Sequence, residues 1–308
     1  MPRQFLLAML FLATAVPTAA QQSTRSSSSS RRDDDEYESR IDTTFAFDKR
    51  GTVVLSVGGG EIIVTGWNRD QIRVRARSER SAVRMDVTPA RVSLDLSRQR
   101  GGDTRFEVTV PLGVRVSARA TTGDISITGT KGSVDANTQN GDLIVEDVAE
   151  TIDLRSMSGD IVARGVAGNL EVTTLSGELT LTDVKGDVDV TTVSGDVELR
   201  NVVAKYVRAK STSGEIAYDG GIDPAGRYEL GSHSGSIYLT IPQNTGALLT
   251  VATYSGSIES DFPITLKPGE HGIGASRRMT FEIGKGDSRI SAESFSGDIT
   301  IRSKVRRP

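Results

Sequence analysis

Acidic residues recur at two fixed positions along the middle of this 308-residue chain, and their spacing suggests chemistry. The first set follows a repeated glycine: Asp124, Asp142, Asp160, Glu178, Asp196 and Glu215. The second set lies half a repeat away: Asp135, Asp153, Glu171 and Asp189, with Arg208 at the next equivalent position. Stacked carboxylates repel one another. A hard divalent cation with oxygen ligands, calcium in particular, would bridge them.

Three interpretations of the second set stay open. The acids keep an outward face solvated and prevent aggregation of sheet on sheet. Alternatively, they bind calcium or a cationic partner, or they are ordinary polar residues at outward positions. Calcium on this acidic face is the metal site that the sequence suggests, and no other cofactor is expected.

No set of residues is typical of an enzyme active site. The chain has no Cys, which excludes thiolate chemistry and cysteine-held zinc. Its two histidines are His233, in a position held elsewhere by hydrophobic residues, and His271, in a Gly-rich loop. We expect a partly buried structural His233 and a surface His271. The repeated serines are equivalent to one another, which argues against one nucleophile among them. No catalytic residue is predicted.

A basic stripe is expected on a strand at residues 71–78, where Arg73, Arg75 and Arg77 share one face. This stripe is either a solvated strand face or a site for anionic glycans or lipid headgroups. The net charge of −3 argues against a nucleic-acid partner.

The elements that carry these residues repeat with a period of about 18 residues. A glycine recurs in the same context at Gly123, Gly141, Gly159, Gly177, Gly195, Gly214, Gly235, Gly256 and Gly297. A fixed period of this size predicts a solenoid, because one repeat cannot bury its apolar side without its neighbours. The glycine supplies a corner with positive φ, and the Ser or Asp beside it hydrogen-bonds the turn backbone.

The predicted fold is all-β: a single-stranded, right-handed parallel β-helix (β-solenoid) with about 18–21 residues per coil. One interior ladder would contain Ile125, Leu143, Ile161, Leu179, Val197, Ile216, Ile237, Ile258 and Ile299. The facing ladder would contain Val134, Ile152, Leu170, Val188 and Val207. Alternation of apolar and polar residues predicts earlier strands at 60–67, 71–78, 92–97 and 106–111.

The N-terminal residues 1–20 are typical of a signal peptide, with Arg3 before an apolar run and a small-residue cleavage site ending at Ala20. This predicts export to the periplasm, the outer surface or the medium. A disordered Ser/Arg/Asp-rich linker is expected at 21–40 and the β-solenoid domain at 41–302. Regular coils are expected at 121–260, a loop interruption at 263–276 and a basic tail at 303–308. After signal cleavage no apolar run is long enough for a transmembrane helix.

The recurring SGDI and SGDV corners, with GEIIVTGW at 60–67 and FSGDITIR at 295–302, resemble the bacterial "putative adhesin" family. This family is an exported β-helical domain of unknown function, and the resemblance covers residues 45–302. It implies a non-enzymatic envelope or cell-surface module, adhesin-like or scaffolding, whose partner is a glycan or a protein. The alternative is a carbohydrate-active enzyme, a polysaccharide lyase or hydrolase, on the same fold. That alternative needs a cleft with a close pair of non-equivalent carboxylates.

Overall fold

The computed structural model describes residues 39–96, 103–263 and 277–304, all within the unit Asp35–Pro308. The predicted signal peptide lies outside the described residues, and so do most of the linker and of the loop interruption and the end of the basic tail. His271 is outside them as well. Within the described ranges the chain forms strands and turns but no helix. Accordingly, no helix there is long and apolar enough to cross a membrane.

The strands follow one another with short connections. The N-terminal strands are β1 (Ser39–Ala46), β2 (Thr52–Trp67), β3 (Gln71–Ser78), β4 (Val83–Thr88), β5 (Arg91–Leu96), β6 (Thr104–Pro111) and β7 (Arg115–Thr128). The next are β8 (Val134–Asn140), β9 (Leu143–Glu146), β10 (Ala149–Ser158), β11 (Ile161–Arg164), β12 (Ala167–Ser176), β13 (Leu179–Thr182), β14 (Val188–Ser194) and β15 (Val197–Val202). The last are β16 (Tyr206–Ser213), β17 (Ile216–Gly220), β18 (Arg227–Ser234), β19 (Ile237–Pro242), β20 (Ala247–Ser255), β21 (Ile258–Ser260), β22 (Arg277–Ile283), β23 (Ser288–Ser296) and β24 (Ile299–Lys304).

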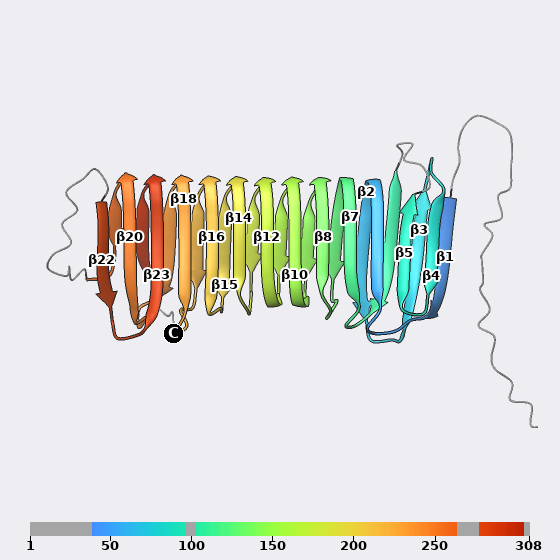
Figure 1. Ribbon diagram of the computed structural model, residues 1–308, viewed down its shortest axis with the longest axis horizontal. Coiled ribbons are helices and arrows are strands. Elements are labelled where there is room, and N and C mark those ends of the chain that lie inside the picture. The colour runs from blue at the N-terminus through green and yellow to red at the C-terminus, as the bar shows by residue number, and fades with distance from the viewer. Residues whose placement is uncertain (1–38, 97–102, 264–276, 305–308) are drawn as a thin grey trace, which may run out of the picture. The chain divides into compact units, whose positions relative to one another are not determined.

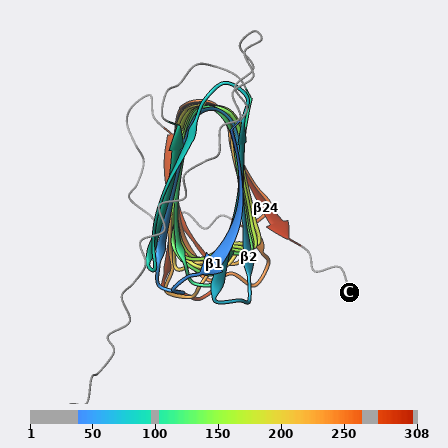
Figure 2. The same cartoon turned by 90° about the vertical axis from the view of Figure 1, so that its right-hand side faces the viewer.

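Each regular coil contributes one strand to each of two faces (Figure 2). We call the face made by β8, β10, β12, β14, β16 and β18 the first face, and the one made by β9, β11, β13, β15, β17 and β19 the second. All pairings within these two sets are parallel, and they keep one register except for a shift between Arg200 and Val202 in the β15–β17 pair. The protein is therefore all-β, mostly parallel and solenoid-like, as the period predicted. Its right-handed winding stays a prediction.

Both interior ladders follow the predicted frame through the regular coils. On the first face Val188 lies between Leu170 and Val207, and all three side chains are buried. On the second face Leu179 lies between Ile161 and Val197, likewise buried. Strict alternation of apolar and polar residues puts every second side chain into this core, because successive residues of a strand point to opposite faces.

The predicted order of the coils is wrong at the C-terminal end. Strand β23 pairs with β18 on one side and with β20 on the other, and β24 likewise lies between β19 and β21 (Figure 1). The second-face ladder thus runs Ile237, Ile299, Ile258 rather than in chain order. The reason is β22, which pairs antiparallel along the outer side of β20. This pairing leaves only the inner side of β20 for the last coil.

The N-terminal end has a similar inversion. Strand β2 lies between β7 on one side and β5 and β6 on the other, so β5 and β6 stack outside β2 although they follow it in the chain. The outermost strands β1 and β4 pair antiparallel with β3 and β5. Antiparallel outer strands at both ends interrupt the repeating parallel pattern, which limits its growth by edge-to-edge association.

The longer coil between Gly214 and Gly235 closes over two tyrosines. The rings of Tyr218 and Tyr228 meet edge to face with centroids 5.8 Å apart. The Tyr228 hydroxyl donates to the Ala204 carbonyl at 2.7 Å and accepts the Asp223 N–H at 2.8 Å. Burial raises the pKa of both tyrosines. These phenols are hydrogen-bonded core residues that absorb the extra chain length of this coil.

Candidate functional site

The acids that follow the repeated glycine stabilise the corners. Oδ1 of Asp124 accepts the N–H of Asp142 at 2.9 Å, and Oδ1 of Asp142 accepts that of Asp160 at 2.9 Å. Asp160 and Asp196 do the same for Glu178 and Glu215. Each carboxylate therefore bonds the corner of the next coil rather than its own turn. The hydrogen bonds from Ser257 hold the pKa of Asp298, at an equivalent corner, below its usual range.

A buried polar row lies behind these corners, and sequence reasoning missed it. Its members stand three residues before each glycine: Thr138, Ser156, Thr174, Thr192, Ser211, Ser232, Thr253 and Ser294. The hydroxyls of Thr138, Ser232 and Ser294 donate to glycine carbonyls at 3.0–3.2 Å. The available signal was a Ser or Thr at this one position in coil after coil.

The predicted acidic face forms one outward row on the first face. Asp135, Asp153, Glu171 and Asp189 are direct register neighbours, and the row continues to Arg208. Arg208 lies 3.8 Å from Asp189, measured from Nη1 to Oδ2. The described residues contain no group of three or more His, Asp or Glu side chains arranged to hold a metal ion. Calcium binding here stays a prediction of the residue pattern.

Asp153 is the strained member of this row. Its Oδ1 is buried without a hydrogen-bond partner, while Arg155 Nη2 lies 2.5 Å from Oδ2. Burial raises the pKa of the Asp153 carboxyl, Glu171 and Asp135 add to the rise, and Arg155 opposes it. The folded protein thus holds this proton to higher pH than the unfolded chain does. Asp153 therefore contributes fully to the free energy of unfolding below the pKa that its carboxyl has in the unfolded chain. This contribution is lost as the pH rises through the pKa of the carboxyl in the folded protein.

Removal of the charges from this row should therefore stabilise the protein at neutral pH. We expect the variant Asp153→Asn, Glu171→Gln, Asp189→Asn to melt slightly higher than the wild type at pH 7, because it lacks the repulsion between neighbouring carboxylates. At about pH 3 the difference should shrink, since the wild-type carboxyls are then largely protonated. Melting curves at both pH values test this, and a triple variant that melts lower at pH 7 would contradict it.

Calcium should separate the remaining interpretations of the acidic face. If the face binds calcium, the ion raises the melting temperature of the wild type, since it binds only the folded array, and leaves that of the triple variant unchanged. If the row instead prevents aggregation, calcium has no effect and the triple variant scatters more light. Melts with and without calcium, with EDTA as the control, distinguish the two.

The arginine stripe lies on the outer face of β3 as predicted, and acids flank it. Arg73 Nη2 lies 3.4 Å from Asp42 Oδ2, and Arg75 lies 3.7 Å from both Asp42 and Glu107. Glu107 also accepts a hydrogen bond from Arg105 Nε at 2.7 Å, which lowers the pKa of Glu107. The stripe is largely neutralised by its neighbours, which reduces its attraction for an anion.

An exposed apolar row runs along the Ser-Gly corners. Its members directly precede the Ser-Gly corner: Met157, Leu175, Val193, Phe295 and Tyr254, which are 45–54% exposed. We call these residues the corner row. They point outward because the next residue inward along the strand, such as Ser156 or Thr174, belongs to the buried polar row. At the opposite corner the matching residues, such as Val148 and Val166, are buried.

His233 occupies the equivalent position in its own coil, two residues before Gly235. Its side chain is exposed, so the expectation of a partly buried histidine is wrong. Its ring stacks on that of Phe295 at 4.8 Å and 11°, and Phe295 stacks on Tyr254 at 4.9 Å and 2°. Adjacent coils thus carry a continuous stack of three aromatic rings at the surface.

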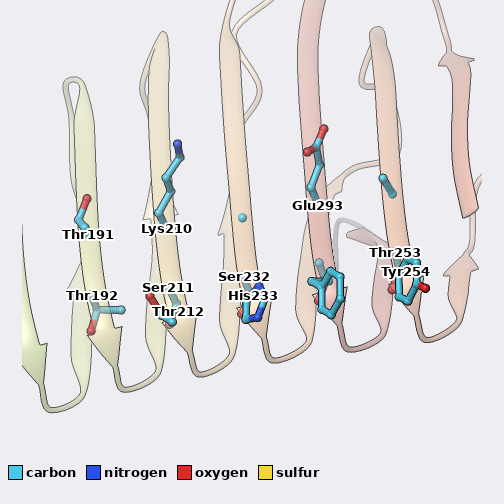
Figure 3. Close-up of a pocket in the computed structure, with 14 residues that line it drawn as sticks. Thr191, Thr192, Lys210, Ser211, Thr212, Ser232, His233, Thr253, Tyr254 and Glu293 are labelled. Atoms are coloured by element: carbon cyan, nitrogen blue, oxygen red, sulfur yellow. The ribbon is translucent and has the colours of Figure 1, made fainter. Parts of the chain in front are cut away.

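A groove of about 640 Å³ lies on the first face beside these rings (Figure 3). Its wall is a row of outward residues from β14, β16, β18, β23 and β20: Thr191, Lys210, Gly231, Glu293 and Ala252. Glu293 is the one carboxylate among the described residues that line it, and Oε1 of Glu293 lies 3.0 Å from Arg278 Nη2. The groove therefore lacks the carboxylate pair of a glycosidase.

A second groove, of about 440 Å³, does contain two carboxylates, Asp187 and Asp223. Oδ1 of Asp187 accepts the N–H of Tyr206 at 3.0 Å, and Oδ1 of Asp223 accepts that of Ala225 at 3.0 Å. Asp187 thus bonds the next coil, and Asp223 stabilises its own turn. This use accounts for their presence without catalysis.

Comparison with known proteins places this geometry in a family. No curated protein matches the chain. Similar solved structures include a "putative cell adhesion protein" from Clostridium sporogenes (11% identity, 86% of this chain and 100% of that one, TM-score 0.26). A "putative adhesin" from Bacteroides fragilis has 12% identity, with 85% and 96% coverage and a TM-score of 0.36. A "putative lipid binding protein" from Parabacteroides distasonis has 9% identity, 85% and 96% coverage and a TM-score of 0.46. The family model Toastrack DUF4097 matches residues 52–302, and the chain belongs to this family.

Proposed function

We propose that the protein is an exported, non-enzymatic interaction module that binds a component of the bacterial envelope or cell surface through its corner row. The observation that carries this proposal is the repetition of large, half-exposed apolar side chains at one register position. Met157, Leu175 and Val193 occupy it in consecutive coils. Exposed apolar side chains gathered in this way mark interaction surfaces.

The charges beside the row favour a component other than an anionic bilayer. Three residues beyond Met157, Leu175 and Val193 stand the corner acids, Asp160, Glu178 and Asp196. A row of carboxylates alongside the apolar row repels anionic lipid headgroups. A protein or an uncharged glycan meets no such barrier there, and beside His233 and Tyr254 the equivalent positions are Ser236 and Ser257, which carry no charge.

Envelope binding tests the proposal. Purified mature protein should sediment with isolated bacterial envelopes, and the variant Met157→Ser, Leu175→Ser, Val193→Ser should bind about tenfold less, because three partly exposed apolar side chains are lost. The matched control, Ile144→Ser with Val203→Ser, removes exposed apolar residues away from the row and should bind like the wild type. Equal binding by both variants, or turnover of a polysaccharide, contradicts the proposal.

Export has its own test. The signal-like pattern at 1–20 predicts a mature protein that begins at Gln21 and is recovered outside the cytoplasm. N-terminal sequencing of the native protein checks this. A protein that retains Met1 and fractionates with the cytosol would overturn the proposed location.

A further inference from the structure

The centre of the groove on the first face is empty because residue 231 is a glycine. In the outward row Gly231 lies between Lys210 of β16 and Glu293 of β23. Neither the backbone nor the packing requires a glycine there. A Cβ at this position would meet no atom nearer than 4.0 Å, and its φ is not in the left-handed region. At Gly235 in the same coil, by contrast, a Cβ would lie 2.0 Å from the Gly214 carbonyl oxygen. The fold explains Gly235 and leaves Gly231 unexplained.

One side of the hollow is the stack of His233, Phe295 and Tyr254, whose rings are exposed along adjacent coils. Hydroxyl groups line the same groove, from the exposed side chains of Thr212 on β16, next to the strand of His233, and of Thr191 on β14 one strand further away (Figure 3). Aromatic rings next to hydroxyl groups in a shallow, open groove suit a sugar. Phe295 is covered by the other two rings, so the C–H groups of a pyranose pack on the outer faces of His233 and Tyr254, while its hydroxyls hydrogen-bond the side chains.

The charges of the groove add a preference. Glu293 is paired with Arg278 and also accepts a hydrogen bond from Ser291 Oγ at 3.3 Å. The Lys210 ammonium makes no ion pair or hydrogen bond anywhere in residues 39–96, 103–263 and 277–304. The uncompensated charge in the groove is therefore positive, and it complements an anionic group on the ligand.

Strand pairing argues against an extended peptide as the occupant. Strands β16, β18 and β23, which form the middle of the groove, are each paired on both sides. Their backbone N–H and C=O groups are used within the face, so a peptide cannot add to it as a further strand. Recognition in this groove falls to side chains alone.

We infer that this groove binds an acidic oligosaccharide, a chain of pyranose rings bearing carboxylates, with one carboxylate on Lys210 and sugar rings against the outer faces of the aromatic stack. The inference rests on the proposed function as an interaction module and names the partner of one part of the corner row. Because successive coils are spaced about 4.8 Å apart, close to the advance of a pyranose chain per ring, neighbouring rings of the ligand meet equivalent positions of neighbouring coils.

Calorimetric titration of the mature protein tests the inference. The probes are hexamers of galacturonic acid and of mannuronic acid, with cellohexaose as the neutral counterpart. We expect an acidic hexamer to bind and cellohexaose to bind much more weakly. Lys210→Met should weaken binding by about tenfold or more, because it removes a charge-assisted hydrogen bond. Gly231→Leu should abolish binding by filling the hollow.

Ile144→Ser is the matched control, since Ile144 is an exposed apolar residue of β9 on the second face, outside both the corner row and the groove. It should bind like the wild type, and it and Lys210→Met should keep the wild-type melting temperature. If Gly231→Leu melts lower, its loss of binding could follow from loss of the fold, and the test then depends on the binding of Lys210→Met. The inference is overturned if neither acidic hexamer binds, if cellohexaose binds equally well, if an apolar peptide competes for the groove instead, or if Lys210→Met has no effect.

The two proposals fail in different ways. If envelopes bind and depend on Met157, Leu175 and Val193 while no acidic hexamer binds, the interaction module stands and the sugar site falls. If the hexamers bind while envelopes do not, the sugar site stands and the envelope partner is wrong.

Discussion

Val188→Asp should destabilise the protein by at least about 4 kcal/mol, because it places a carboxylate in an apolar interior without a partner. Val188 is fully buried between Leu170 and Val207 on the first face. The interior there is a continuous ladder of aliphatic side chains, so the new charge has no donor to receive it. The melting temperature should fall by roughly 10 °C, given the size of the folded unit.

The neighbouring residue supplies the control. Asp189 points outward, with Arg208 Nη1 3.8 Å away, and its side chain is 40% exposed. Asp189→Asn should change the free energy of unfolding by less than about 1 kcal/mol, as is usual for exposed ion pairs. Melting curves of both variants make the comparison. Similar losses in the two would mean that the assignment of inward and outward residues is wrong.

The sequence predicts this alternation because burial decides it locally. In a strand the period of two leaves one set of residues inside, and Leu170, Val188 and Val207 differ plainly from Glu171, Asp189 and Arg208. The same local logic identifies most of the glycine corners, since their glycines from Gly123 to Gly235 and Gly297 have positive φ. At the opposite corners Asp147, Glu150, Asp183 and Asn201 adopt positive φ as well, and the sequence does not single them out. The alternation and the glycine corners need no knowledge of distant parts of the chain.

The order of the terminal coils, by contrast, depends on pairing between strands that are distant in the sequence. The corners at Gly235, Gly256 and Gly297 carry the same Ser-Gly pattern, so this pattern does not indicate the order in which the coils stack. The order is decided by β22, whose antiparallel pairing with β20 blocks the outer side. No local pattern distinguishes the alternatives, and the chain-order ladder was therefore wrong.

The exposure of the corner row is likewise not evident from the sequence. Apolar residues that recur every nine residues look like one core position, yet Met157 is exposed and Val166 is buried. The difference follows from the inner polar row, since a buried Ser156 forces Met157 outward. The groove was beyond the sequence as well, because only the structure shows that a side chain at Gly231 would meet no obstacle.

Gly195→Ala should be nearly as damaging as a buried charge, although it adds a single methyl group. The backbone at Gly195 has φ 142°, and a Cβ there would lie 2.0 Å from the carbonyl oxygen of Gly177 in the preceding coil. Backbone strain and overpacking each cost about 1–3 kcal/mol, so we expect a loss of roughly 2–6 kcal/mol. The clash falls on backbone atoms, which cannot rotate away as a side chain can.

Gly231→Ala is the matched control, because a Cβ there meets nothing nearer than 4.0 Å on an ordinary strand backbone. It should stabilise the protein by about 0.4–1 kcal/mol, since alanine lowers the entropy of the unfolded chain. The two glycine substitutions are thus expected to have effects of opposite sign on the melting temperature. Opposite signs would establish that the corner glycines stack backbone on backbone, whereas Gly231 is dispensable to the fold and free to shape the groove. Equal losses would show instead that the first face needs a glycine at residue 231.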